Sequence, residues 1–303
     1  AEARFHQFEE VARVAEFLPR PLPPEEPLAP YGDLLRARAF LARGDPAGSA
    51  AAASRAAEAP GFPMRDEAAR VEADALARAG RRAAAVARLD REESAGLRLA
   101  AARASAEAGD RAGARRRLAD IVLGAPAGSD AERAFEELRA SVPDPTARFT
   151  AAERPRLADA ARRWGEAGRV DPALALLRSA RRPGASTASV TPAEAVVEAD
   201  LLLRAGRAAE AEPLVARALR AGGAPSDEAA YLAARIARAR GRFGAWRGAL
   251  SRLAARPSAS PWRLAALADL ARSEEGRPSA AALAAYRRYR DAAGRLAEPG
   301  VLW

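Results

Sequence analysis

Few residues in this sequence are of the types that catalyse reactions. Cysteine is absent, which excludes a thiolate nucleophile, a thiolate metal site and a disulfide framework. The only histidine is His6, and one imidazole without cysteine partners makes neither a catalytic triad nor a metal site. We interpret it as a surface or packing residue. No cofactor is expected, because the glycines are isolated and form neither a GxGxxG nor a GxxxxGK[ST] loop.

Three acidic pairs could in principle supply a general acid and a general base. They are Glu92-Glu93, Glu136-Glu137 and Glu274-Glu275. Each lies among arginines on a predicted helix surface, where mixed charges are typical of a solvated face. We therefore interpret all three pairs as solvated helix charge and not as catalytic groups.

The elements that would position a site are set by a repeated glycine. A glycine followed by Arg or Asp recurs at steps of 36, 29, 59, 38, 35 and 35 residues, at Gly44, Gly80, Gly109, Gly168, Gly206, Gly241 and Gly276. A period near ~34 residues, with a helix on each side of the break, is typical of tetratricopeptide-type helical hairpins. Each glycine is expected to end the first helix of a hairpin in the left-handed conformation, which suits a residue without a Cβ.

Two further columns support this alignment, because helices cross closely only where side chains are small. Alanine stands seven residues before the glycine in six of the seven hairpins and five residues after it in five of them, so the phase is more than a result of composition. The exceptions are Asp269 in the first column and Ser49 and Trp246 in the second. The sequence predicts an all-α fold, a right-handed α-α superhelix of about seven hairpins, in which each hairpin buries its apolar stripe against its neighbours.

The repeats divide the chain into three segments. Residues 1–30 are expected to form an N-terminal cap helix followed by a proline-rich connector. Residues 31–142 are expected to hold three hairpins and one unpaired helix at Asp130–Ala140, which accounts for the long step of 59. Residues 143–303 are expected to hold four hairpins of an array that is truncated at its C-terminus. The predicted helix N-caps include Asp66, Thr191, Ser226 and Ser260.

One column of the repeat carries charge. Six residues before the glycine, on the first helix of the hairpin, six of the seven residues are charged, and four of these are the arginines Arg38, Arg103, Arg162 and Arg235. First helices line the concave surface of tetratricopeptide arrays, so these arginines are candidates for holding an anionic partner in the groove. Ladders of ion pairs between neighbouring hairpins explain the column equally well, and we favour that interpretation.

The net charge of +9 invites a nucleic-acid interpretation. All 49 basic residues are arginine, however, and lysine and asparagine are absent, which indicates a GC-rich genome as the source of much of the basicity. The 40 carboxylates are interspersed with the arginines, so we expect no nucleic-acid partner. No apolar run approaches the roughly 18 residues of a membrane span. The four tryptophans are predicted to be core residues and not a stacking platform.

A family resemblance rests on four stretches of the sequence. They are Pro27–Asp45, which opens the first hairpin, Gly128–Arg169 with its unpaired helix, Ser260–Asp291, and the final Gly300–Trp303. In these features and their order, the chain resembles the N-terminal superhelical region of soluble lytic murein transglycosylases, bacterial periplasmic enzymes that cleave peptidoglycan glycan strands without water. The resemblance covers nearly the whole chain.

The resemblance implies a periplasmic, non-catalytic scaffold that cradles a glycan strand or positions a catalytic domain of the same protein. In the family that domain carries a Glu-Ser pair followed by Phe, Pro, Ala and a Gly-Leu-Met-Gln stretch. Here Glu93-Ser94 is the only such pair and lacks what should follow, so no catalytic residue is carried over. Further hairpins and a lysozyme-like domain are expected downstream of Trp303. The alternative is a free-standing tetratricopeptide adaptor that binds an extended peptide along its groove.

Overall fold

The computed structural model describes residues 21–23, 26–181, 190–222, 226–257, 260–273 and 280–296. These residues contain sixteen helices and no strand, and consecutive helices pack as hairpins. The all-α hairpin fold predicted from the glycine period is therefore confirmed. The expected cap helix, His6, Gly276 and the pair Glu274-Glu275 lie outside the described residues.

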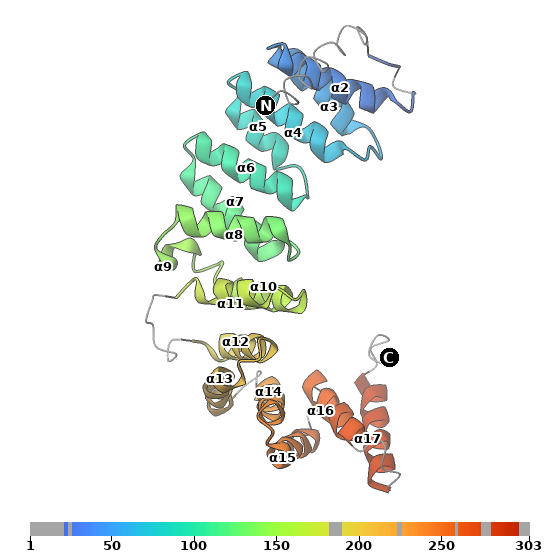
Figure 1. Ribbon diagram of the computed structural model, residues 1–303, viewed down its shortest axis with the longest axis vertical. Coiled ribbons are helices and arrows are strands. Elements are labelled where there is room, and N and C mark those ends of the chain that lie inside the picture. Colours follow the sequence, from blue (N-terminus) through green and yellow to red (C-terminus); the bar gives the residue numbers. More distant parts are fainter. Residues whose placement is uncertain are drawn as a thin grey trace. The chain divides into compact units, whose positions relative to one another are not determined.

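Contacts divide the chain into two compact units, Ala1–Asp144 and Pro145–Trp303. Unit 1 contains three hairpins and one further helix (Figure 1). The hairpins are α2 (Ala29–Ala42) with α3 (Pro46–Glu58), α4 (Arg65–Arg78) with α5 (Arg82–Leu89), and α6 (Ala95–Glu107) with α7 (Arg111–Gly124); the last helix is α8 (Ser129–Ser141).

Unit 2 begins with the single turn α9 (Pro145–Arg148) and continues with four hairpins. They are α10 (Arg156–Glu166) with α11 (Val170–Arg178), α12 (Pro192–Arg204) with α13 (Ala208–Ala221), α14 (Ser226–Ala239) with α15 (Phe243–Ala254), and α16 (Pro261–Ser273) with α17 (Ala280–Leu296). Each hairpin joins an N-terminal member, here called the first helix, to a second helix.

The glycine between the two helices of a hairpin has the conformation that the sequence predicts. Its φ lies between 70° and 87° at Gly44, Gly80, Gly109, Gly168, Gly206 and Gly241. At each of these turns the glycine N–H donates to the carbonyl three residues earlier, and the next N–H donates to the carbonyl five residues earlier. This pair of hydrogen bonds is the Schellman motif, which satisfies carbonyls at the helix end that have no partner within the helix. One local device thus ends six of the first helices.

Two of the predicted N-caps agree with the structure, since Thr191 forms a capping box in front of α12 and the hydroxyl of Ser260 accepts a backbone hydrogen bond in front of α16. The prediction of an N-cap at Ser226 is one residue off, because Ser226 is the first residue of α14. The prediction of an N-cap at Asp66 is wrong, because α4 begins one residue earlier, at Arg65. Asp66 instead lies in the first turn of α4, where a negative charge interacts favourably with the helix dipole.

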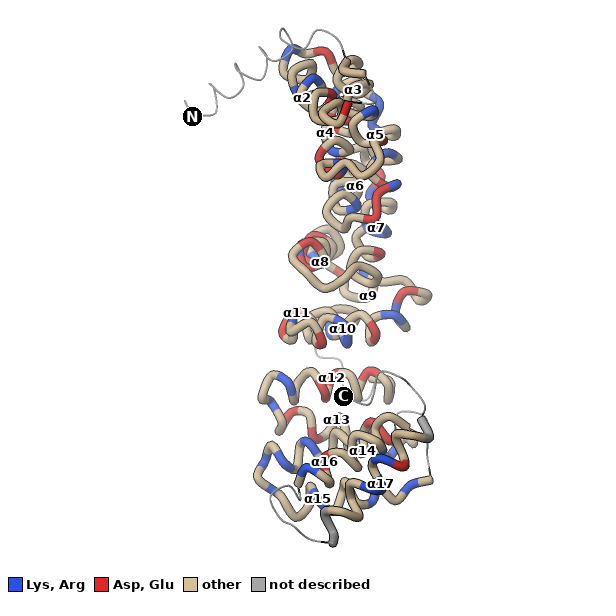
Figure 2. Tube along the Cα trace, turned by 90° about the vertical axis from the view of Figure 1, so that its right-hand side faces the viewer, with Lys and Arg blue, Asp and Glu red and all other residues tan. Residues whose placement is uncertain are grey.

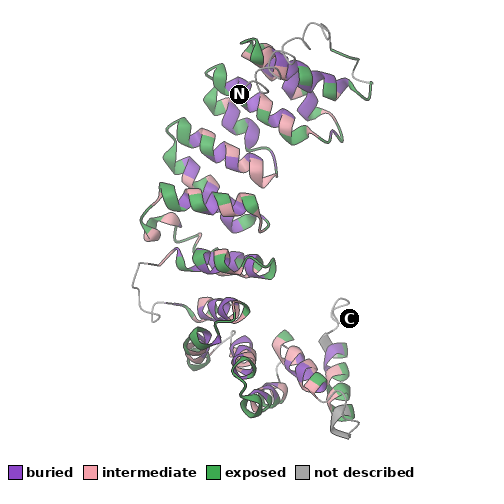
Figure 3. Ribbon diagram, viewed as in Figure 1, coloured by how far each residue is buried: buried purple, intermediate pink, exposed green. Residues whose placement is uncertain are grey.

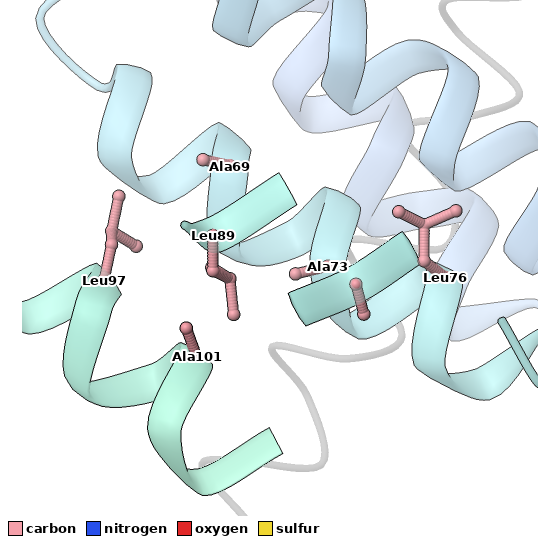
Figure 4. Packing of buried hydrophobic residues seen from close by; sticks show 7 residues of the cluster. Ala69, Ala73, Leu76, Leu89, Leu97 and Ala101 are labelled. Atoms are coloured by element: carbon pink, nitrogen blue, oxygen red, sulfur yellow. The ribbon is translucent and has the colours of Figure 1, made fainter. Parts of the chain in front are cut away.

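The core is built mainly of alanine and leucine, and it lies between helices of neighbouring hairpins. Figure 4 shows one cluster in which side chains of α4, α5 and α6 meet. Its members are Ala69, Ala73, Leu76, Ala85, Leu89, Leu97 and Ala101. Each fully buried leucine contributes about 1.5 to 3 kcal/mol, whereas alanine mainly allows the backbones to approach. Since this cluster joins one hairpin to the first helix of the next, a hairpin completes its core only by stacking.

The described members of the two alanine columns lie inside this core (Figure 3 shows the buried strips along the helices). The alanine seven residues before each turn glycine is buried in all six described hairpins that carry it. The exceptional residues Asp269, Ser49 and Trp246 are buried as well. The columns therefore mark positions of helix contact, including those where alanine is replaced.

Successive first helices pack against one another at five of the six steps within the units, whereas α4 and α6 form no comparable contact. Helix α2 contacts α4 and α6 contacts α8 in unit 1, and α10 contacts α12, α12 contacts α14 and α14 contacts α16 in unit 2. In the described part of the chain, successive second helices form no comparable contacts. The first helices therefore lie on the inner side of each array. Helix α8 packs on α6 and α7 as a first helix would, which gives the unpaired helix a regular place in unit 1.

Candidate binding surface on the first helices

We call the inner side of each array the first-helix face. It is formed by α2, α4, α6 and α8 in unit 1 and by α10, α12, α14 and α16 in unit 2. The four arginines singled out from the sequence lie one each on α2, α6, α10 and α14. Figure 2 shows basic and acidic residues intermixed along the helices of both units.

In unit 1 both arginines pair with a carboxylate of the next first helix. Arg38 on α2 forms an ion pair with Glu67 on α4. Arg103 on α6 donates from Nε to Oε1 of Glu137 on α8, at 2.9 Å. All four side chains are a third or more exposed, so these pairs lie at the solvated surface of the face.

In unit 2 the pairs are more enclosed and reach further. Arg162 on α10 donates through both Nη atoms to Glu228 on α14, at 2.6 and 3.2 Å, and so passes over the intervening first helix. Its hydrogen bonds to Glu228 raise the pKa of Arg162 above its usual value, although burial acts in the opposite direction. Arg235 on α14 donates to Asp200 on α12 at 2.8 Å. The carboxylates of Glu228 and Asp200 are only 12% and 15% exposed.

Each candidate arginine therefore has an acidic partner on another helix of the same first-helix face. This is the arrangement required by a ladder of ion pairs, the interpretation that we favoured from the sequence. The candidate role of Arg38, Arg103, Arg162 and Arg235 in holding an anionic ligand stays a prediction. The ladder also fixes the side chains of the face, because a paired arginine has fewer accessible rotamers than a solvated one.

Tyr231 and Asp269 extend the charged face of unit 2 to α16. The hydroxyl of Tyr231 on α14 donates to Oδ2 of Asp269 at 2.9 Å, and Arg272 pairs with the same carboxylate. Burial, together with the negative charge of Asp269 and the hydrogen bond to it, raises the pKa of Tyr231 to about 12. Sequence reasoning missed this pair, although a carboxylate at a column otherwise occupied by alanine was a signal that this position has a polar partner.

A hollow opens on the first-helix face of unit 2, beside the turn at Gly241. Its volume is about 730 Å³. It is lined by Leu203 of α12, Tyr231, Arg235, Arg238 and Ala239 of α14, Phe243 and Trp246 of α15, and Asp269 of α16. We call it the Trp246 hollow. Of the tryptophans predicted to be core, Trp164 and Trp246 are buried, Trp262 is half-buried, and Trp303 lies outside the described residues.

Unit 1 has two hollows that also include members of the charged column. One, of about 590 Å³, lies along α4 and includes Glu67, Val71 and Asp74. The other, of about 810 Å³, lies between α6, α7 and α8 and includes Arg103 and Glu137. The first-helix face therefore combines charge with recesses in both units.

The interpretation of Glu92 as solvated helix charge is wrong. Glu92 follows the end of α5, and its side chain is 7% exposed because it packs against Arg88, which donates from Nη1 to Oε1 at 2.7 Å. Arg88 also pairs with Glu72 of α4. Burial lowers the pKa of Arg88, but the hydrogen bonds to Glu92 and Glu72 outweigh it and leave the pKa above its usual value. These three charges stabilise one another inside unit 1, and their pairing offsets the free-energy cost of removing them from water.

The remaining candidates are dispersed. Glu136 is exposed, and Ser94 is the N-cap residue of α6. Among the described residues, no group of three or more His, Cys, Asp and Glu side chains is arranged to hold a metal ion. None of the helices in the described ranges combines the length and the apolar character needed to cross a bilayer.

Comparison with known proteins finds similarity in structure but not in sequence. No family model matches the sequence, and no curated protein matches it. A solved tetratricopeptide repeat protein from Parabacteroides merdae ATCC 43184 aligns with 86% of this chain and 98% of its own, at 12% identity and a TM-score of 0.29. A likeness at this TM-score carries no inference about function.

Proposed function

We propose that this chain is a non-catalytic helical-repeat scaffold that binds an extended polypeptide along its first-helix face. The observation that carries the proposal is that the hollows of 590 to 810 Å³ described above open beside members of the charged column, at Asp74, Arg103 and Arg235. Each hollow combines apolar side chains with guanidinium and carboxylate groups. A polypeptide offers the matching mixture at regular intervals along an extended chain.

The preformed charge ladder supports binding, because a face whose side chains are already fixed loses little conformational entropy when a partner docks. Rigid hairpins supply the same advantage to the backbone. Stacked repeats also present their first helices as one extended surface within a unit, which suits a linear ligand better than a compact one.

A charge-swapped pair tests the proposal. Arg103→Glu reverses a charge on the face and also breaks the pair with Glu137, so it confounds binding with stability. The double variant Arg103→Glu/Glu137→Arg restores the ion pair with reversed polarity. We expect the double variant to unfold like the wild-type protein and to lose retention of the peptides that the wild-type protein retains from an immobilised peptide library.

The corresponding swap in unit 2 is Asp200→Arg/Arg235→Glu combined with Arg204→Gln, because Arg204 also pairs with Asp200. The two swaps together examine both units. If both swapped proteins retained the same peptides as the wild-type protein, the charged column would serve only as a structural ladder and the proposal would be overturned. Loss of binding in only one swap would assign the peptide to that unit.

A second proposal follows from the family resemblance of Pro27–Asp45, Gly128–Arg169 and Ser260–Asp291. In that case the chain is the superhelical region of a periplasmic peptidoglycan lytic transglycosylase, and its partners are a glycan strand and a catalytic domain in the same protein. This proposal requires that the gene encode a Glu-Ser motif of the family beyond Trp303, and sequencing that region tests it. Retention on purified peptidoglycan, but not on the peptide library, would favour it over the first proposal.

A further inference from the structure

The Trp246 hollow is shaped by the turn between α14 and α15. Gly241 has φ +70°, and its Schellman motif ends α14 so that Phe243 becomes the first residue of α15. The rings of Phe243 and Trp246 form a T-shaped pair, with a centroid distance of 6.5 Å and an interplanar angle of 83°. Trp246 is buried, whereas Phe243 is 60% exposed. An apolar ring is therefore held in water at the rim of the hollow, although burial would be favourable for it.

Arg238 brings a positive charge to the same place. Its guanidinium lies 5.2 Å from the centroid of the Trp246 ring, a cation-π contact on one side of the hollow. Arg238 forms no ion pair with any carboxylate among the described residues, in contrast to the arginines around it. The cation is positioned by an aromatic ring and is not neutralised.

The neighbouring carboxylates are already engaged. Asp200 accepts from Arg235 and Arg204. Asp269 accepts from Tyr231 and Arg272. Glu212, on the far side of the turn, pairs with both Arg240 and Arg242, and these hydrogen bonds lower the pKa of Glu212. The carboxylates around Arg238 are all paired with other cations, and these five arginines outnumber the three carboxylates, so the positive charge of Arg238 remains beside an exposed phenylalanine.

We propose that the Trp246 hollow anchors a peptide segment in which a carboxylate stands next to an apolar side chain. The carboxylate accepts hydrogen bonds from Arg238, and the apolar side chain covers Phe243. This inference rests on the proposed function, since it names the peptide chemistry that one part of the first-helix face recognises. Charge complementarity selects the carboxylate, and the exposed ring selects its apolar neighbour.

The test uses the full chain and an array of immobilised peptides, each with one Asp or Glu beside Leu, Ile or Phe. Matched peptides carry Asn or Gln in place of the acid. The test variants are Arg238→Gln and Phe243→Ala. Their controls are Arg220→Gln and Leu219→Ala on α13, which remove the same charge and another exposed apolar side chain from the same unit, away from the hollow. Equal unfolding midpoints of each test variant and its control show that any change in binding is local.

We expect the wild-type protein to bind the acidic peptides about tenfold more tightly than the amide peptides, as the loss of one charge-assisted hydrogen bond predicts. Arg238→Gln should abolish that preference, because the acid then has no guanidinium to meet, and Phe243→Ala should weaken both peptide sets. Arg220→Gln and Leu219→Ala should bind like the wild-type protein. If the preference for acidic peptides depends on Arg238, the peptide carboxylate and the Arg238 guanidinium are energetically coupled, which identifies the contact between them.

Two outcomes would overturn the inference, and they differ in what else they overturn. If peptides bind equally well with and without the acid, and Arg238→Gln changes nothing, the inference about the Trp246 hollow is overturned but the proposed peptide-binding function is not. Failure of every peptide to bind, with retention on peptidoglycan instead, removes the proposed function and this inference together.

Discussion

Two charged clusters, one in each unit, have opposite polarity, although unit 1 also holds a buried carboxylate between two arginines, Asp33 with Arg36 and Arg55. In unit 1 an arginine is enclosed by two carboxylates: Arg88 lies between Glu72 and Glu92, and all three side chains are 12% exposed or less. In unit 2 a carboxylate is enclosed by two arginines: Glu198 accepts from Arg178 at 2.7 Å and from Arg181 at 2.6 Å. Glu198 is buried, whereas its two arginines remain partly in water. One hairpin architecture therefore accepts a buried cluster of either polarity, but only unit 1 buries the whole cluster.

The first-helix faces of the two units also differ, in how far their ion pairs reach along the array and in how enclosed these pairs are. In unit 1 each face pair joins first helices that are neighbours and remains solvated, as Arg38 with Glu67 does. In unit 2 Arg162 reaches Glu228 across α12, and Glu228 is nearly buried. The difference teaches that the glycine period determines the hairpin, whereas the residues placed at each repeat determine how closely the first helices converge.

The largest expected effect comes from breaking the enclosed cluster of unit 1. Arg88→Met keeps the bulk of the side chain but leaves Glu72 and Glu92 buried without their shared cation, although Arg65 still lies 3.3 Å from Glu92. Removing one partner of a buried pair costs about 3 to 5 kcal/mol. All four tryptophans belong to unit 2, so tryptophan emission follows that unit, while far-ultraviolet circular dichroism follows both. We expect Arg88→Met to lower the circular-dichroism transition of unit 1 and to leave the emission transition in place.

The matched variant in unit 2 is Glu198→Gln. It removes the central charge, but Arg178 and Arg181 can turn their guanidinium groups to water, so the expected cost is smaller, about 1 to 3 kcal/mol. This loss should appear in tryptophan emission. An equal loss in the two variants would contradict the comparison, because it would mean that the depth of burial of the partners does not matter.

The second prediction concerns the two faces. Glu228→Gln leaves Arg162 facing a neutral amide in a largely enclosed site, and we expect it to destabilise unit 2 by about 1.5 to 3 kcal/mol, as for hydrogen bonds to charged groups. Glu67→Gln breaks a solvated pair in unit 1 and should cost about 0 to 1 kcal/mol. Urea unfolding at low and high salt measures both, and only the small effect at Glu67 should vanish at high salt. If Glu67→Gln cost as much as Glu228→Gln, the two faces would not differ in enclosure.

The sequence predicts the hairpins well because their determinants are local. A turn that needs a left-handed residue requires glycine, so Gly44, Gly80 and their equivalents can be aligned without any knowledge of packing. The burial of the alanine column follows from the same register. By contrast, the sequence places Arg88 four residues before Glu92 but does not show that Arg88 also pairs with Glu72 and that all three side chains become buried, so local charge patterning gave the wrong answer there.

The candidate site was predictable only in part, for the same reason. The charged column located Arg162 and Arg235, but the partner Glu228 lies 66 residues from Arg162 and two hairpins away. The period gives no information on which repeat an arginine reaches, because this depends on how far the first helices converge. The Trp246 hollow was missed because the sequence predicts only that Trp246 is a core residue, and the exposure of Phe243 results from the geometry of the turn before it.

The smallest expected effect is a pH dependence that is confined to unit 2. Burial beside Asp269 raises the pKa of Tyr231 from 10.0 to about 12 in the folded protein, because the folded site disfavours the phenolate. The unfolded chain therefore loses this proton first, so Tyr231 contributes its full stability below about pH 10 and loses it as the pH rises towards 12. Since part of the ring remains in water, the change should be modest.

Tyr231→Phe isolates this contribution. Between pH 9 and pH 12, the emission-detected urea midpoint of the wild-type protein should fall further than that of the variant, because the ionisation of the other three tyrosines is common to both. Tyr31, Tyr286 and Tyr289 remain in the variant, so tyrosinate absorbance should show one late-titrating group in the wild-type protein that the variant lacks. Parallel decreases in the two midpoints would mean that the hydroxyl of Tyr231 meets Asp269 without being withdrawn from water. The first-helix face of unit 2 would then be as open to solvent as that of unit 1, and the contrast between the two faces would rest on Arg162 and Glu228 alone.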